Sequence, residues 1–162
     1  MSLYLGDVKR PTSGVWAYFL LCYLCRGQWS QRASVMDKKS EENILAAEEL
    51  ISKGYYNSSI HCSYYALFQH MKYILDHCGL CTYESQDKKT NTKGSHDNIL
   101  KELEPHIKDV QLRCKVHHSF PFWKKLRSVA DYQVTQVVQG DSQKCLDDVR
   151  DIIEQLSKCF NT

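Results

Sequence analysis

Apolar side chains recur at steps of three and four residues between residues 58 and 78, and this pattern constrains the fold of the chain more than any other. The recurring residues are Ile60, Tyr64, Leu67, Met71, Ile74 and Leu75. Because three to four residues make about one turn of an α-helix, these side chains share one face. A face this apolar must be buried, so the segment predicts a helix that ends near Cys78 and packs against other helices.

An earlier segment has the same period. Residues 37–53 place Ile44, Ala47 and Ile51 on one face, and the remaining positions are rich in Glu, Lys and Ala. Gly54 follows directly, and glycine is the residue that most often ends a helix because it adopts the left-handed conformation without strain. We expect a helix here, joined to the next one by a tight turn.

The second half of the body predicts three more helices. Residues 99–110 keep a helical period, but Pro105 should end or bend the helix near Glu104. Pro121 suits the first turn of another helix that runs to about Tyr132. A final helix is marked by a stripe of apolar residues, namely Cys145, Leu146, Val149, Ile152, Ile153, Leu156 and Phe160.

The connections decide the fold class. The polar segment TYESQDKKTNTKGS, residues 82–95, contains Gly94 and is predicted to be a mobile connection exposed at one end of the molecule. No segment requires a β-strand, and short connections between amphipathic helices favour antiparallel neighbours. Residues 36–162 therefore predict one all-α domain, an up-and-down bundle of four to five helices.

Residues 1–35 differ from this domain in composition. An apolar run from Val15 to Cys25 follows basic residues, which is the outline of a signal peptide, but no small-x-small cleavage site follows it cleanly. The run is too short to cross a bilayer as a helix. Three explanations stay open for this leader: translation that starts at Met36, an extra packed hairpin or helix, or a signal peptide.

The chain contains eight cysteines. Residues 36–162 have enough apolar residues for a core, so disulfides are not needed, and we expect mostly free thiols. Two Cys-x-x-Cys pairs, Cys22 with Cys25 and Cys78 with Cys81, lie much further apart than the paired knuckles of a zinc site. We therefore expect no metal and no cofactor.

Three segments, taken in order, resemble a known family. AAEELISKGYYNSSIHCSYYALFQHMKYIL, residues 46–75, is similar to the first helical hairpin of HEPN domains, the higher eukaryote and prokaryote nucleotide-binding family. SHDNIL, residues 95–100, resembles their short third helix. LRSVADYQ, residues 126–133, is similar to the Leu-Arg-x-x-Ala-Asp-Tyr signature of one branch. The resemblance covers about residues 37–160.

The resemblance implies a cytoplasmic helical bundle with no membrane segment, frequently a homodimer. Such proteins are often encoded beside a small nucleotidyltransferase as a toxin–antitoxin pair, or act on RNA. Many are metal-independent ribonucleases in which an Arg is followed, after four to six residues, by a His. Arg127 occupies the matching helix, but Tyr132, Gln133 and Val134 stand where that His belongs. The standard ribonuclease motif is therefore missing.

A basic and aromatic stretch offers candidates for nucleic-acid contact. In RCKVHHSFPFWKKLR, residues 113–127, Lys124, Lys125 and Arg127 alternate with aromatic residues that include Trp123. Cations for phosphates and rings for unpaired bases are typical of single-strand binding. The alternative is that Trp123 belongs to the core and the lysines face solvent. Arg113 and His118 have the ribonuclease spacing, but they precede the helix that begins at Pro121.

The remaining candidates share two helices. Arg127 and Asp131 are four residues apart, a spacing that allows either a surface ion pair or a phosphate-binding fork. Tyr64 is expected in the core, whereas Tyr65 lies toward His61 on a partly exposed side of the same helix. His96, at the start of the third helix, is either a capping residue or a ligand contact.

The resemblance implies a HEPN-like nucleotide- or RNA-associated protein, part of a toxin–antitoxin or defence system, that lacks the standard ribonuclease motif. The first alternative is a metal-independent ribonuclease that uses Arg127 or Arg113 with His118. The second is a non-catalytic interaction bundle. A nucleotide or RNA site would draw on Arg127, Asp131, Tyr65, His61, His96, Lys124, Lys125 and Trp123.

Overall fold

The computed structural model describes residues 35–90 and 95–162. The predicted leader therefore lies outside the described residues, apart from residue 35. Within the described ranges the chain is helical without a β-strand, as predicted. A first helix spans residues 35–52. It is followed by α2 (Tyr56–His77), α3 (Tyr83–Thr90), α4 (Ser95–Leu103), a 3-10 turn (Glu104–His106), α5 (Val110–Tyr132) and α6 (Gln139–Phe160).

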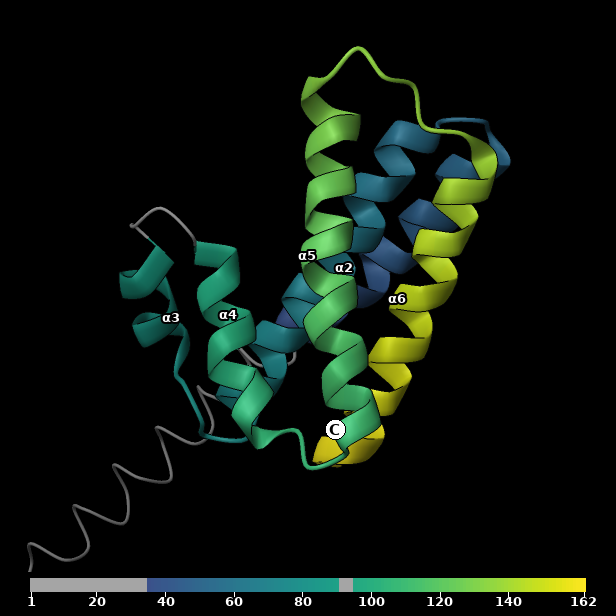
Figure 1. Ribbon diagram of the computed structural model, residues 1–162. Helices are drawn as coiled ribbons and strands as arrows, with labels where there is room; N and C mark the ends of the chain where they lie inside the picture. Colours follow the sequence, from purple (N-terminus) through teal and green to yellow (C-terminus); the bar gives the residue numbers. More distant parts are fainter. Residues whose placement is uncertain (1–34, 91–94) are drawn as a thin grey trace, which may run out of the picture.

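Four long helices form an up-and-down bundle: the first helix, α2, α5 and α6. Helix α2 contacts both α5 and α6 extensively, and α5 runs antiparallel to α6 (Figure 1). Helices α3 and α4 lie to one side of the bundle (Figure 1). In the sequence they come between α2 and α5. None of the described helices is long and apolar enough to cross a membrane.

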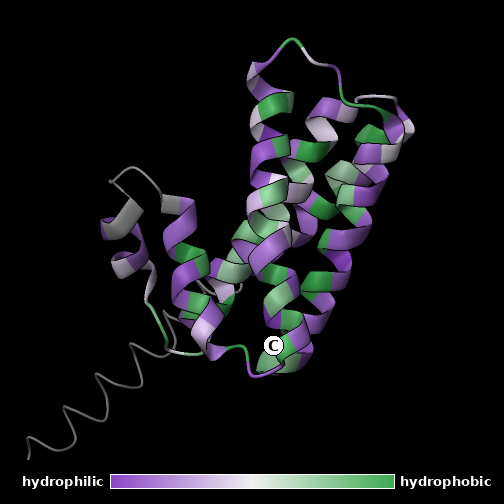
Figure 2. Ribbon diagram, viewed as in Figure 1, coloured by the Kyte–Doolittle hydropathy of each residue, from purple (hydrophilic) through white to green (hydrophobic). Residues whose placement is uncertain are grey.

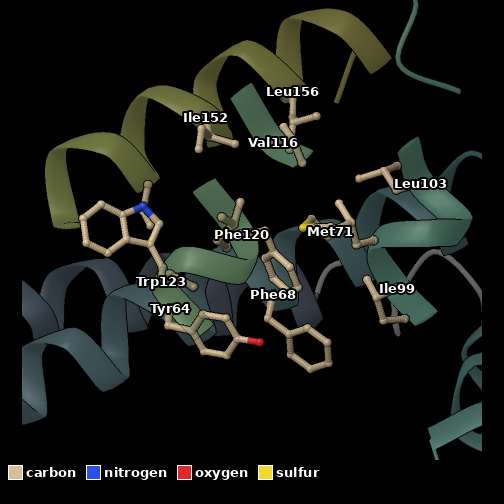
Figure 3. Packing of buried hydrophobic residues seen from close by; sticks show 14 of the residues in the cluster. Tyr64, Phe68, Met71, Ile99, Leu103, Val116, Phe120, Trp123, Ile152 and Leu156 are labelled. Carbon is tan, nitrogen blue, oxygen red and sulfur yellow. The ribbon is translucent and has the colours of Figure 1, made fainter. Parts of the chain in front are cut away.

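The predicted apolar face of α2 forms the centre of the core. All six of its residues are fully buried, namely Ile60, Tyr64, Leu67, Met71, Ile74 and Leu75. Apolar residues of α5 and α6 meet this face, and Figure 2 shows the apolar residues concentrated where the helices adjoin. Figure 3 shows Phe120 and Met71 at the centre of this packing. Each large side chain buried in this way contributes about 1.5–3 kcal/mol to folding.

The turn after the first helix is built as predicted. Gly54 has a φ of +79°, in the left-handed region that favours glycine. The amide of Tyr55 donates to the carbonyl of Leu50 at 2.8 Å, which satisfies one of the free carbonyls at the helix end. The next helix, α2, begins one residue later.

The segment predicted to be a mobile connection is partly helical, so that prediction was wrong for residues 83–90. Helix α3 is anchored by Gln86, which is 1% exposed and donates its amide to the carbonyls of Lys72 at 3.1 Å and Cys81 at 2.8 Å. The amide of Tyr83 donates to Asp76 at 3.0 Å. Polar side chains hold this helix, and a search for apolar periodicity does not detect them.

The fourth predicted helix begins earlier than expected. Helix α5 is capped by Asp109, whose carboxylate accepts from the amides of Gln111 at 2.8 Å and Leu112 at 3.1 Å. Pro121 lies inside the helix with an exposed ring. A proline in a helix interior costs about 3 kcal/mol. The continuous buried face of α5 outweighs this cost, since its residues before and after Pro121 all enter the core: Leu112, Val116, Phe120, Trp123 and Ala130.

Candidate functional site

Aromatic rings from two helices form one wall of the candidate site. Helix α2 supplies Tyr64, which is fully buried, then Tyr65 and Phe68. Helix α4 supplies His96, which stacks on Phe68 with ring centroids 4.1 Å apart and lies parallel to Tyr64 at 5.6 Å. Tyr65 meets His96 edge-on at 6.0 Å. In Figure 3 the Tyr64 hydroxyl points toward Phe68.

A short hydrogen bond connects this wall. The Tyr64 hydroxyl lies 2.6 Å from Nδ1 of His96. Burial, followed by the positive charges of Lys124 and Arg127, lowers the pKa of His96 to about 4, so its imidazole is neutral at pH 7. Burial also raises the pKa of Tyr64. We therefore assign Tyr64 as the donor and Nδ1 of His96 as the acceptor, which leaves the proton of His96 on Nε2.

Arg127 of α5 lies against the same rings. Its guanidinium carbon is 5.5 Å from the centre of the Tyr64 ring and 5.7 Å from that of Tyr65, within the range of cation–π attraction. Its Nη1 donates to Oδ2 of Asp131 at 3.0 Å, the pair predicted from their spacing. The two side chains are only 12% and 17% exposed, so this pair is less solvated than an ordinary surface pair. Arg127 Nε is buried and has no hydrogen-bond partner among the residues that the structure describes.

Asp131 also binds His61, across 70 residues of sequence. Nδ1 of His61 lies 3.1 Å from both carboxylate oxygens, and the ring of His61 packs on Tyr65 at 4.6 Å. The side chain of His61 is 45% exposed. A carboxylate thus joins a nearly buried guanidinium to a half-exposed imidazole, and both groups pack on the ring of Tyr65.

An open pocket of about 360 Å³ adjoins this group. Its lining includes His61, Asp131 and Asn57. On the other side of Arg127, Lys124 donates from Nζ to Asp97 of α4 at 2.7 Å. The surface formed by His61, Tyr65, His96, Lys124, Arg127 and Asp131 is called the Arg127 surface below.

Six of the predicted site residues are therefore together, and the other four are not. Trp123 is only 2% exposed and belongs to the core, which was the alternative to RNA contact. It therefore has no surface on which a base could stack. Lys125 is exposed on α5, and its side chain leaves the helix about 100° away from that of the neighbouring Lys124. Arg113 and His118 both lie inside α5, not before it as predicted. Positions five apart on a helix differ in direction by about 140°, so these two side chains diverge.

His118 also lies far from Arg127 within one chain. They are nine positions apart on α5, and a helix rises about 1.5 Å per residue, so the two are roughly 13.5 Å apart along its axis. His118 is exposed, and its ring contacts His117 at 5.2 Å. The expected combination of His118 with Arg127 or Arg113 is therefore not formed within one chain.

A second histidine cluster was not predicted from the sequence. Nε2 of His70 lies 3.1 Å from the Ser157 hydroxyl of α6, and its Nδ1 lies 3.4 Å from Asp37 of the first helix. The order Ser, His, Asp is that of hydrolase triads. However, the carboxylates of Asp37 and Glu41 line the adjoining 230 Å³ cavity, and a negative surrounding disfavours the oxyanion of acyl transfer. We interpret the cluster as a structural link between three helices.

Neither cluster of side chains is arranged to ligate metal. Within residues 35–90 and 95–162, no group of three or more His, Cys, Asp and Glu residues is placed to hold a metal ion. Of the second Cys-x-x-Cys pair, Cys78 is exposed and Cys81 is buried. The predicted pair Cys22 and Cys25 lies outside the described residues.

The contacts that build the Arg127 surface come from distant parts of the sequence. Tyr64 and His96 are 32 residues apart, and His61 and Asp131 are 70 apart. No family model matches this chain, and a search of curated proteins finds no match either. The function is therefore inferred from the site itself.

Proposed function

We propose that the protein is a HEPN-like nucleotide- or RNA-binding protein and that the Arg127 surface is its binding site. One observation carries this proposal: a nearly buried guanidinium lies on two tyrosine rings beside a half-exposed histidine and a 360 Å³ pocket. A guanidinium is the side chain best suited to bind phosphate through two parallel hydrogen bonds. Partly exposed aromatic rings supply stacking for an unpaired base.

Five of the six residues of the surface contact the ligand in this proposal. Arg127 and Lys124 bind phosphate oxygens, and Tyr65 with His61 stacks on a base. Stacking on an aromatic side chain contributes about 1–3 kcal/mol per base. His96 stays neutral at pH 7, because its pKa is lowered to about 4, and offers Nε2–H as a hydrogen-bond donor.

The test is binding of a fluorescently labelled single-stranded RNA by the full chain and by Arg127→Ala. We expect Arg127→Ala to lower the affinity at least about tenfold, because it removes both the phosphate contact and the cation–π support of the rings. Arg113→Ala is the matched control, since it removes an arginine of the same helix that lies outside the surface. Equal losses in both variants would mean that binding depends on overall charge only, and would contradict the proposed site.

A second candidate function is metal-independent cleavage of RNA. The contact between His61 and Asp131 favours it, because a carboxylate orients an imidazole that can accept or donate a proton, while Arg127 next to it can stabilise a phosphorane. In this arrangement His61 takes the part expected of His118. Cleavage of labelled RNA in the presence of chelator, lost in His61→Ala and kept in His118→Ala, would support it.

The partners rest on the resemblance alone. We propose a cytoplasmic homodimer that pairs with a small nucleotidyltransferase in a toxin–antitoxin or defence system. Light scattering of the purified chain tests the dimer. A monomer at all concentrations would contradict this part of the proposal without affecting RNA binding.

A further inference from the structure

Asp131 occupies the place in which a phosphate would meet the Arg127 surface. Its carboxylate accepts from Nη1 of Arg127 at 3.0 Å and lies 3.1 Å from Nδ1 of His61 through both oxygens. Both residues meet the RNA ligand in the proposed function, Arg127 through a phosphate and His61 through stacking on a base. Carboxylates and phosphates both accept charge-assisted hydrogen bonds from guanidinium groups, and Asp131 accepts one such bond, from Nη1 of Arg127.

We propose that the Asp131 carboxylate is an internal substitute for phosphate, which occupies the cationic site in the free protein and lowers its affinity for RNA. This inference rests on the proposed function of the same surface. It gives Asp131 the opposite role from that of a residue that helps to bind the ligand. A phosphate that enters must displace a like charge, so the free protein is selective for ligands that bind strongly enough to do so.

The remaining contacts of Arg127 fit this role. The rings of Tyr64 and Tyr65 hold the guanidinium at 5.5 Å and 5.7 Å independently of Asp131, so it stays in place when the carboxylate leaves. Within residues 35–90 and 95–162, Arg127 Nε has no hydrogen-bond partner, so the guanidinium keeps a donor that these residues do not use. Asp131 lies in the last turn of α5, where a side-chain rotation moves the carboxylate without unwinding the helix.

The second cation of the surface is neutralised in the same way. Nζ of Lys124 donates to Asp97 at 2.7 Å, and this pair is 30% and 47% exposed. The Arg127–Asp131 pair is less exposed, at 12% and 17%. Because electrostatic interactions strengthen as solvent is excluded, Asp131 opposes an incoming phosphate more than Asp97 does.

The experiment compares the full chain with Asp131→Asn in fluorescence anisotropy with a short labelled single-stranded RNA at low salt. Asparagine keeps the shape and one acceptor oxygen but removes the charge. We expect binding to tighten by about fivefold to tenfold, the effect of one like charge removed beside a bound phosphate. Asp151→Asn is the matched control, because it removes a carboxylate that pairs with Lys115 at the contact between α5 and α6. It should change the affinity by less than about twofold.

Two further variants separate the possible outcomes. Asp131→Ala should also bind more tightly, and the gain should disappear when Asp131→Asn is combined with Arg127→Ala, because Asp131 acts through Arg127. Circular dichroism verifies that each variant is folded. If the unmodified chain binds and both Asp131 variants bind equally or more weakly, the inference is wrong and the proposed function stands. If neither the unmodified chain nor the variants bind, both are wrong.

Discussion

Helix α2 carries two histidines that each face a carboxylate, and their surroundings differ. His70 is 3% exposed, between Asp37 and the Ser157 hydroxyl. His61 has a 45% exposed side chain, between Asp131 and the ring of Tyr65. A histidine paired with an aspartate thus links helices in the core in the first case and lines a pocket in the second. Burial decides which of the two a histidine can do, because only an exposed imidazole can meet a ligand.

The largest expected effect is the loss of folding stability when His70 is removed, compared with the loss when His61 is removed. His70→Ala should lower the free energy of unfolding by about 2–4 kcal/mol, because it leaves a cavity and removes the hydrogen-bond partner of Ser157. His61→Ala should lower it by less than about 1 kcal/mol, since solvent replaces the contact with Asp131. Urea unfolding followed by circular dichroism measures both. Equal losses would mean that the two pairs do not differ as their burial indicates.

The pH dependence of stability sharpens the same comparison. The pKa of His96 is lowered to about 4 in the folded protein, and burial also lowers the pKa of His70. Between about pH 4 and pH 6.5 the unfolded chain therefore binds more protons, so stability is full above pH 6.5 and falls with decreasing pH. The slope from His96 should stay below the ~1.4 kcal/mol per pH unit of one full proton, because the folded and unfolded chains differ by less than one proton bound at this group.

Unfolding measured at several pH values, with His96→Gln beside the unmodified chain, checks this effect. Glutamine keeps an acceptor for Tyr64 but does not titrate. The variant should lose less stability on acidification than the unmodified chain does. A pH dependence that stays the same in His96→Gln would show that His96 is not the group responsible.

The long-range contacts explain what the sequence could and could not predict. Apolar periodicity identified the long helices and the burial of Tyr64, and a four-residue spacing identified the pair of Arg127 with Asp131. Local patterns carry no information on which residue of α2 meets α5, so the contact of His61 with Asp131 was missed. Helix α3 was missed because the amide of Gln86, not an apolar stripe, anchors it. Pro121 misplaced the start of α5, because tertiary packing overrode a local preference.

A smaller effect is expected on binding when the exposed histidine is removed. His61→Ala should weaken binding of labelled single-stranded RNA by about threefold to tenfold, because one ring of the stacking surface is lost. The matched control is His118→Ala. His118 is one of two adjacent exposed histidines on α5, and its removal should leave the affinity unchanged. A loss of affinity in His118→Ala, with none in His61→Ala, would place the ligand on the exposed face of α5 and not on the Arg127 surface.

The smallest expected effect extends the comparison to two ion pairs. Lys124 and Asp97 are 30% and 47% exposed, whereas Arg127 and Asp131 are 12% and 17% exposed. Asp97→Asn should therefore change the free energy of unfolding by only about 0.2–0.5 kcal/mol, and Asp131→Asn by about 1 kcal/mol. Added salt should reduce the effect of Asp97→Asn on the free energy of unfolding more than the effect of Asp131→Asn, because screening acts mainly on exposed pairs. Unfolding at low and high salt measures both, and a larger, salt-resistant loss in Asp97→Asn would contradict burial as the factor that distinguishes these pairs.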